Sequence, residues 1–170
     1  GVAAEAQALL AEWDFRMRAN RPEPAIYMAW ARAFRDGLVA RDLSHLARAL
    51  DPVNPVFLAR VLEDVDGAAA WCAPDCATAV RVARDTALAR LTADGTALRA
   101  LRWGAAHVAT HDHTALGTVP ALRRLVNIRH PLPGGDDTLL RGLTRGGTER
   151  PMEASHAAGD RMVVDLGDAD

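Results

Sequence analysis

Apolar residues in the first two-thirds of the chain recur at the three- and four-residue spacing of helices that bury one face. The first such stripe consists of Ala6, Leu9, Leu10, Trp13 and Met17. Residues at this spacing share one side of an α-helix, so the stripe predicts an amphipathic first helix. The sequence RPEP then ends that helix and starts the next, because proline is tolerated in the first turn of a helix.

Three further helices are predicted by apolar stripes and capping residues. The apolar face of the second consists of Ile26, Trp30, Ala33 and Phe34. Asn54 followed by Pro55 predicts the start of a third helix. Its apolar residues are Phe57, Val61 and Leu62. Asp75 is placed to cap a fourth helix that ends at Asp94-Gly95. Its inward residues are Val80, Ala83, Ala87, Leu88 and Leu91.

The pattern changes after Trp103, where the chain becomes rich in Gly, Pro, Thr and His as far as Arg150. The end of the chain, RMVVDLGD, alternates in the manner of a strand and closes at Gly167-Asp168. Its two faces carry Met162, Val164 and Leu166 on one side and Val163 and Asp165 on the other. DTLLRGL, after the Gly-Gly turn, is a candidate second strand.

These elements predict an α+β fold that is predominantly helical, with one or two C-terminal β-strands. Residues 1–102 form the helical segment, and residues 103–170 form an irregular segment that leads into the strands. Strands need neighbours, and the chain offers at most one convincing partner for its last strand. Together with a first residue, Gly1, that is not Met, this favours a piece of a larger protein. Whether Gly1 and Asp170 are natural ends stays open.

Charge and composition exclude several classes of partner. The net charge is −2, and all 20 basic residues are arginines spread along the chain. A nucleic-acid or anionic-membrane partner normally selects a clustered basic surface, so neither is predicted. No apolar run is long enough to cross a bilayer, and no signal peptide is visible at the start.

Cys72 and Cys76 lie four residues apart and permit three interpretations. The first is a pair of small apolar residues near a helix start, and the second is a disulfide formed in an oxidising compartment. A metal site is the weakest, because structural zinc takes four ligands. Their redox state stays open at this point.

The stretch WGAAHVATHDHTALG places His107, His111, Asp112 and His113 within seven positions. A helix would place His107 and His111 on one face, whereas a strand would place His111 and His113 on one face. The segment cannot be both, so neither conformation gathers all three histidines as zinc ligands. We therefore predict no metal site. Instead, we expect His107 and His113 to hydrogen-bond the irregular backbone around them, because buried backbone groups need partners.

Two other motifs are weak candidates for chemistry. GGDD, from Gly134 to Asp137, lacks the following helix and lysine of a phosphate loop and the ligand series of a calcium loop. We interpret it as a tight turn into a strand, with Gly at positive φ and Asp closing the turn. Ser155, His156 and Asp165 lack the motif of a nucleophile elbow, so no catalytic triad is predicted.

Five segments together resemble the penicillin acylase (penicillin amidase) family of N-terminal nucleophile hydrolases. In order, they are LLAEWDFRM, AIYMAWARAF, the Trp103-Gly104…His107…His113…Leu116 stretch, VPALRRLVN with PLPGGDDTL, and RMVVDLGDAD. The resemblance runs from about Leu9 to Asp170 and points to an internal section of the family's β-subunit. His111, Thr114 and Asp160 depart from the family pattern.

The resemblance implies a four-layer αββα fold in the intact enzyme and hydrolysis of a linear amide, such as an acylated β-lactam or an acyl-homoserine lactone. It also implies a periplasmic or secreted enzyme without a cofactor, whose nucleophile is the β-subunit's N-terminal serine. An α-amino group has a pKa of about 7.7–8.0 and can therefore accept a proton near neutral pH. Only a chain-terminal residue carries such a group. The serines here, Ser44 and Ser155, are internal. We therefore predict that this chain contains no catalytic residue and is inactive alone. The sequence does not assign its substrate-binding residues.

The expected partners are the remainder of the β-subunit, an α-subunit and a small acyl-amide substrate in the intact enzyme. Helical Trp and Phe residues are interpreted as core, although part of this surface would be exposed without a complete sheet, which predicts self-association. The alternative hypothesis is a stand-alone helical interaction module without chemistry, and a weaker third is a small metalloprotein built on the histidines.

Overall fold

The structure, a computed structural model, describes residues 1–40, 53–146, 150–157, 162 and 167. The principal helices are α1 (Val2–Ala11), α2 (Glu23–Ala40), α3 (Pro55–Leu62) and α4 (Cys76–Leu91). Shorter helices are η2 (Val65–Trp71), η3 (Leu98–Ala100), α5 (Trp103–Ala106), η4 (Leu116–Thr118) and α6 (Arg123–Val126). The strands are β1 (Val108–His111), β2 (Ile128–Pro131), β3 (Gly142–Thr144) and β4 (Ala154–Ala157). The described residues are therefore mixed α/β, which is consistent with the predicted α+β class.

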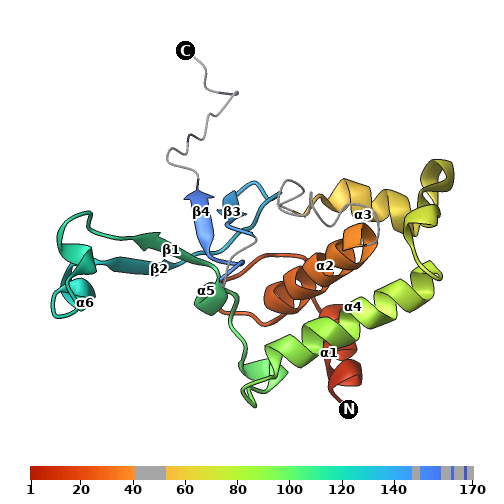
Figure 1. Cartoon of the computed structure of the whole chain (residues 1–170), viewed down its shortest axis with the longest axis horizontal. Helices are drawn as coiled ribbons and strands as arrows, with labels where there is room; N and C mark the ends of the chain where they lie inside the picture. Colours follow the sequence, from red (N-terminus) through yellow and green to blue (C-terminus); the bar gives the residue numbers. More distant parts are fainter. Residues whose placement is uncertain (41–52, 147–149, 158–161, 163–166, 168–170) are drawn as a thin grey trace.

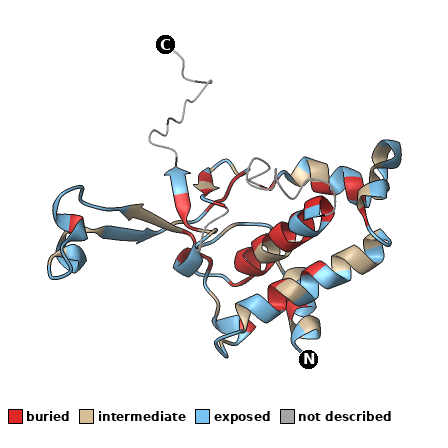
Figure 2. Ribbon diagram, in the orientation of Figure 1, coloured by how far each residue is buried: buried red, intermediate tan, exposed pale blue. Residues whose placement is uncertain are grey.

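Helix α2 lies at the centre of the helical part, with α4 packed along it and α1 beside both (Figure 1). Its buried residues form most of the core, as the red shading along its length shows (Figure 2). One cluster joins Phe34 and Leu38 of α2 to Ala83 and Ala87 of α4. A second joins α1 to α2 and α4 through Leu9, Ile26 and Leu88. The predicted inward positions are therefore confirmed at Ile26 and Phe34 of α2 and at Ala83, Ala87 and Leu88 of α4.

The capping residues act as the sequence predicted. The side chain of Asn54 accepts a hydrogen bond from the Phe57 N–H at 3.0 Å, and α3 starts at Pro55. The carboxylate of Asp75 accepts one from the Thr78 N–H at 2.8 Å at the start of α4. Such bonds satisfy N–H groups that have no partner inside the helix.

Helix α1 is shorter than the apolar stripe predicted, because the chain leaves the helix after Ala11. A turn replaces its last part: the Arg16 N–H donates to the Asp14 carboxylate at 3.1 Å, and Phe15 has a φ of 59°. Trp13 and Met17 therefore lie on a loop. Asp side chains favour such turns by bonding their own backbone two residues on, which competes with helix formation.

The second half forms a four-stranded sheet in the order β2-β1-β4-β3. The β1–β2 and β3–β4 pairs are antiparallel, and β1 and β4 are joined in parallel at Ala109 and Ala154. The expectation of one or two strands was therefore too low. Strands of three or four residues with Gly, Pro and His lack the long alternation that identifies a strand in sequence.

DTLLRGL contributes only its end to β3, because Asp137 to Arg141 form the preceding turn. The predicted strand over RMVVDLGD falls on residues that the structure does not describe, apart from Met162 and Gly167. The β1–β2 hairpin, with α6 at its far end, projects away from the helices as an arm (Figure 1). None of the helices in the described residues is long and apolar enough to cross a bilayer.

Candidate functional site

The two cysteines form a disulfide between the end of η2 and the start of α4, with the Sγ atoms 2.01 Å apart. The second of the three interpretations of Cys72 and Cys76 is therefore the one that the structure shows. Cys72 also belongs to the main core cluster, which agrees with the apolar environment of the first interpretation. The pair is thus a covalent link at the edge of the core.

The structure disperses the candidate histidines. His107 is fully buried, and its ring stacks on Trp103 with the ring centroids 4.6 Å apart. His111 ends β1 at the surface, and Asp112 forms an exposed ion pair with Arg129. His113 lies in the arm, where its Nδ1 accepts hydrogen bonds from the N–H groups of the next turn. No group of three potential metal ligands occurs in the described part of the chain.

His107 and His113 bond the irregular backbone, as predicted. Nδ1 of His107 lies 2.9 Å from the carbonyl oxygen of Met152 and therefore carries the proton that it donates. Nε2 is buried and has no hydrogen-bond partner among the described residues. Burial lowers the pKa of His107, because the imidazolium is disfavoured away from water, and this outweighs the raising effects of the Met152 bond and of Asp136.

The GGDD segment joins the loop after α1 to the sheet. The Gly134 N–H donates to the Met17 carbonyl at 2.8 Å, and the Trp103 indole N–H donates to the Gly134 carbonyl at 2.8 Å. Gly134 has a φ of 84°, which confirms the predicted glycine turn. The buried carboxylate of Asp136 accepts hydrogen bonds from both the N–H and the hydroxyl of Thr144 in β3.

The remaining candidate residues do not form a triad in the described structure. Ser155 lies in β4 and donates its hydroxyl to the Leu143 carbonyl at 3.1 Å. His156 is its neighbour on the same strand, where successive side chains point to opposite faces of the sheet. Ser44 and Asp165 lie outside the described residues.

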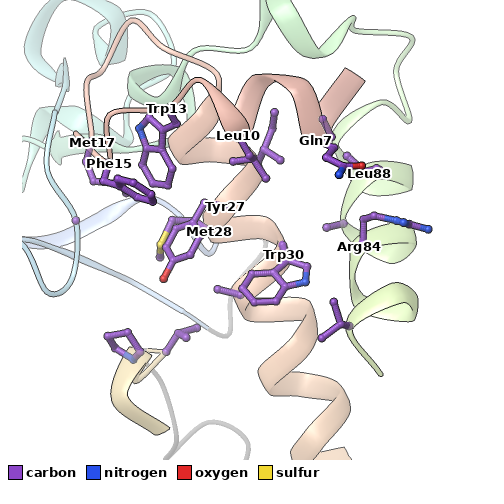
Figure 3. Close-up of a pocket in the computed structure, with 18 of the residues that line it drawn as sticks. Gln7, Leu10, Trp13, Phe15, Met17, Tyr27, Met28, Trp30, Arg84 and Leu88 are labelled. Carbon is purple, nitrogen blue, oxygen red and sulfur yellow. The ribbon is translucent and has the colours of Figure 1, made fainter. Parts of the chain in front are cut away.

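An apolar cavity of about 960 Å³ lies between α1, α2, α4, the loop after α1 and the GGDD turn. Trp13, Phe15, Tyr27, Met28 and Trp30 line one side of it in succession (Figure 3). The ring centroids are 5.5 Å apart for Trp13 and Tyr27 and 6.2 Å apart for Tyr27 and Trp30. Such spacings are typical of aromatic rings in contact, so the wall is continuous.

Sequence reasoning did not find this cavity. Phe34 is a core residue, as expected for the helical Trp and Phe residues, but Trp13 and Trp30, for which the same was expected, keep part of their surface open to the cavity, as Tyr27 does. The signal was present in α2: Tyr27 stands next to the buried face and adds an aromatic position beyond the stripe. The turn at Asp14 was decisive, because it carries Trp13 off the helix and onto the cavity wall.

The described residues thus define a class of mixed α/β protein with an aromatic-lined cavity. Comparison with protein families narrows this class. Residues 2–170 match the family Penicillin amidase, and the chain therefore belongs to the penicillin amidase family. No curated protein matches the chain.

Proposed function

We propose that the chain serves in the hydrolysis of a linear amide, as the part of a penicillin-amidase enzyme that supports the catalytic sheet and binds the apolar acyl group of the substrate. Family membership supports an amidohydrolase role. The observation that carries the acyl-binding assignment is the aromatic cavity. Its volume of about 960 Å³ is at the upper end of the range for small-molecule sites, roughly 300–1,000 Å³.

The composition of the lining suits an acyl group better than a polar ligand. Side chains from Ala, Leu, Ile, Val and Met complete the wall between the aromatic rings: Ala3, Ala6, Leu10, Met17, Ile26, Met28, Val53, Val80 and Leu88. Transfer of apolar surface from water to such a wall contributes about 25 cal/mol per Å². An aromatic or medium-length aliphatic acyl group of an acylated β-lactam or acyl-homoserine lactone is therefore the proposed occupant.

We further propose that these 170 residues supply no nucleophile. A serine hydroxyl needs an adjacent base, and in the mechanism that the family resemblance implies, this base is the serine's own α-amino group. Ser44 and Ser155 each follow another residue and have no free α-amino group. The Ser155 hydroxyl is also engaged with the Leu143 carbonyl. The chain accordingly binds the acyl group without cleaving the amide.

The test combines binding and hydrolysis on the purified chain. Phenylacetamide and hexanamide are titrated while tryptophan fluorescence and the heat of binding are followed, with acetamide as the control that lacks an apolar acyl group. We expect saturable binding of the first two, weakened in Trp30→Ala and unchanged in Trp71→Ala, since Trp71 does not line the cavity. Release of phenylacetate above a buffer control would contradict the inactive assignment, and absence of binding would contradict the acyl assignment.

The proposed partners are the remainder of the β-subunit and an α-subunit. The arm offers a surface for them, because every residue of β2, including the apolar Ile128, is exposed and Leu125 of α6 is exposed as well. The disulfide supports the periplasm or the exterior as the site of action, since such bonds persist in oxidising compartments. We expect the chain alone to self-associate through the exposed apolar residues of the arm, and light scattering after size exclusion measures this directly.

A further inference from the structure

The charged side chains that line the aromatic cavity differ in whether they already have a hydrogen-bond or ion-pair partner. The lining contains Arg84, Asp136 and Asp137. Arg84 pairs with Asp85 at 2.8 Å, and Asp136 accepts both hydrogen bonds from Thr144. Asp137, at the exposed rim, has no hydrogen bond or ion pair within the described part of the chain. Asp137 is thus the carboxylate of the cavity lining that has no hydrogen bond or ion pair among the described residues, although the charge of Arg141 acts on it.

This carboxylate acts on the aromatic wall. Burial raises the pKa of the Tyr27 hydroxyl, and the negative charge of Asp137 raises it further. Loss of water likewise raises the pKa of Asp137, and Asp136 adds to the effect while Arg141 opposes it. Tyr27 is half-buried and Asp137 is exposed, and both line the cavity, so the negative charge of Asp137 lies at the rim beside the aromatic wall. A cation entering this space would relieve the repulsion.

The wall itself also favours a cation. The faces of Trp and Tyr rings carry negative electrostatic potential and attract ammonium groups within about 6 Å. Trp13, Tyr27 and Trp30 follow one another along the cavity, and none is fully buried (Figure 3). The apolar walls behind them accept the rest of a ligand. Ring faces and a nearby carboxylate are a combination that selects an ammonium group joined to an apolar body.

We propose that the cavity binds amides whose acyl part joins an ammonium group to an aromatic or aliphatic body, with Asp137 as counter-ion and Trp13, Tyr27 and Trp30 as the cation-binding wall. This inference rests on the proposed acyl-binding function, because it concerns the same cavity. It adds a charge requirement that an apolar pocket alone does not impose. Asp137 is then the residue that determines specificity, and it takes no part in bond cleavage.

The test uses three probes with one body: protonated 2-phenylethylamine, neutral 2-phenylethanol and anionic phenylacetate. Their affinities for the purified chain are measured by calorimetry near pH 7 at low salt. We expect the amine to bind about tenfold more tightly than the alcohol and the anion to bind more weakly than either, since cation–π contact with the half-buried rings and an ion pair at the exposed rim together favour the cation by roughly this factor. Asp137→Asn removes the preference, and Asp137→Glu retains it.

Glu63→Gln is the matched control, because it removes one exposed negative charge from a residue that does not line the cavity. It should leave the tenfold preference intact, and circular dichroism checks that each variant is folded. Equal binding of amine and alcohol, or a preference that survives Asp137→Asn, overturns the ammonium inference and leaves the apolar acyl site standing. Failure of all three probes to bind contradicts the acyl-binding function itself.

Discussion

The close approach of Gly142 to His107 predicts that Gly142→Ala destabilises the chain. A methyl group built on Gly142 lies 2.5 Å from Nε2 of His107 and 3.2 Å from its Cε1, whereas ordinary contact begins near 3.4 Å. The new atom therefore overlaps the ring by nearly 1 Å. The ring has little room to move, because it is buried, stacked on Trp103 and bonded to the Met152 carbonyl.

The magnitude follows from this overlap. Overpacking of a well-filled core costs roughly 1–3 kcal/mol, and the fixed position of His107 puts the change near the middle, at about 2 kcal/mol. For a chain of this length, that loss lowers the melting temperature by about 4–8 °C. Urea unfolding followed by circular dichroism, and a thermal scan of the same samples, measure both quantities.

The chain offers a matched control in Gly37→Ala. Gly37 lies exposed in α2, and a methyl group there meets nothing within 4 Å. The same chemical change should therefore stabilise the chain by roughly 0.5–1 kcal/mol, because alanine is the better helix former. A His107→Ala, Gly142→Ala double variant should recover part of the loss relative to the sum of the single changes. If Gly142→Ala is neutral or stabilising, our account of the His107 environment is wrong.

Three other predictions address the same fold. Burial lowers the pKa of His107 below its ordinary 6.5, so the native state binds fewer protons than the unfolded state as the pH falls below that value. The contribution of His107 to the free energy of unfolding is therefore full above pH 6.5 and declines as the pH falls toward the lowered pKa. His107→Gln should flatten this pH dependence when urea unfolding is measured from about pH 7.5 to about pH 5.5. Replacing Cys72 and Cys76 with serine should cost about 2 kcal/mol in the same assay, from the entropy of closing a short loop, and a reductant should reproduce the loss in the wild-type chain only. Asp75→Ala should cost about 1 kcal/mol by removing the bond to the Thr78 N–H, whereas Asp75→Asn should retain most of the stability; equal losses in the two variants would refute the capping role.

The helical half was the more predictable from sequence, because its information is local. Asn54 and Asp75 precede their helices directly, and the apolar stripes of α2 and α4 extend over several turns. The exception is the end of α1, where the Asp14 turn ended a stripe that alone would have continued. A polar side chain that bonds its own backbone overrides an apolar period in this way.

The sheet and the cavity were not predictable in the same manner. The parallel pairing of β1 with β4 at Ala109 and Ala154 joins residues that are far apart in the sequence, and no local sequence pattern predicts it. The aromatic wall gathers Trp13 from a loop and Tyr27 and Trp30 from a helix around the distant Asp137. By contrast, the backbone-bonding roles of His107 and His113 were predictable, since an irregular, partly buried segment needs side chains that satisfy its backbone.

The bonds that join the two halves of the chain also set an order of events during folding. Helices α2 and α4 form from local contacts, whereas the indole of Trp103 reaches Gly134 and the guanidinium of Arg32 reaches Thr144, 112 residues away. Contacts between residues so distant in sequence form slowly, because a long loop must close before they contribute. We therefore expect the helices to assemble first and β3 to dock late. Until that step the GGDD turn does not close the cavity, so the proposed acyl-binding site is complete only when folding is nearly finished.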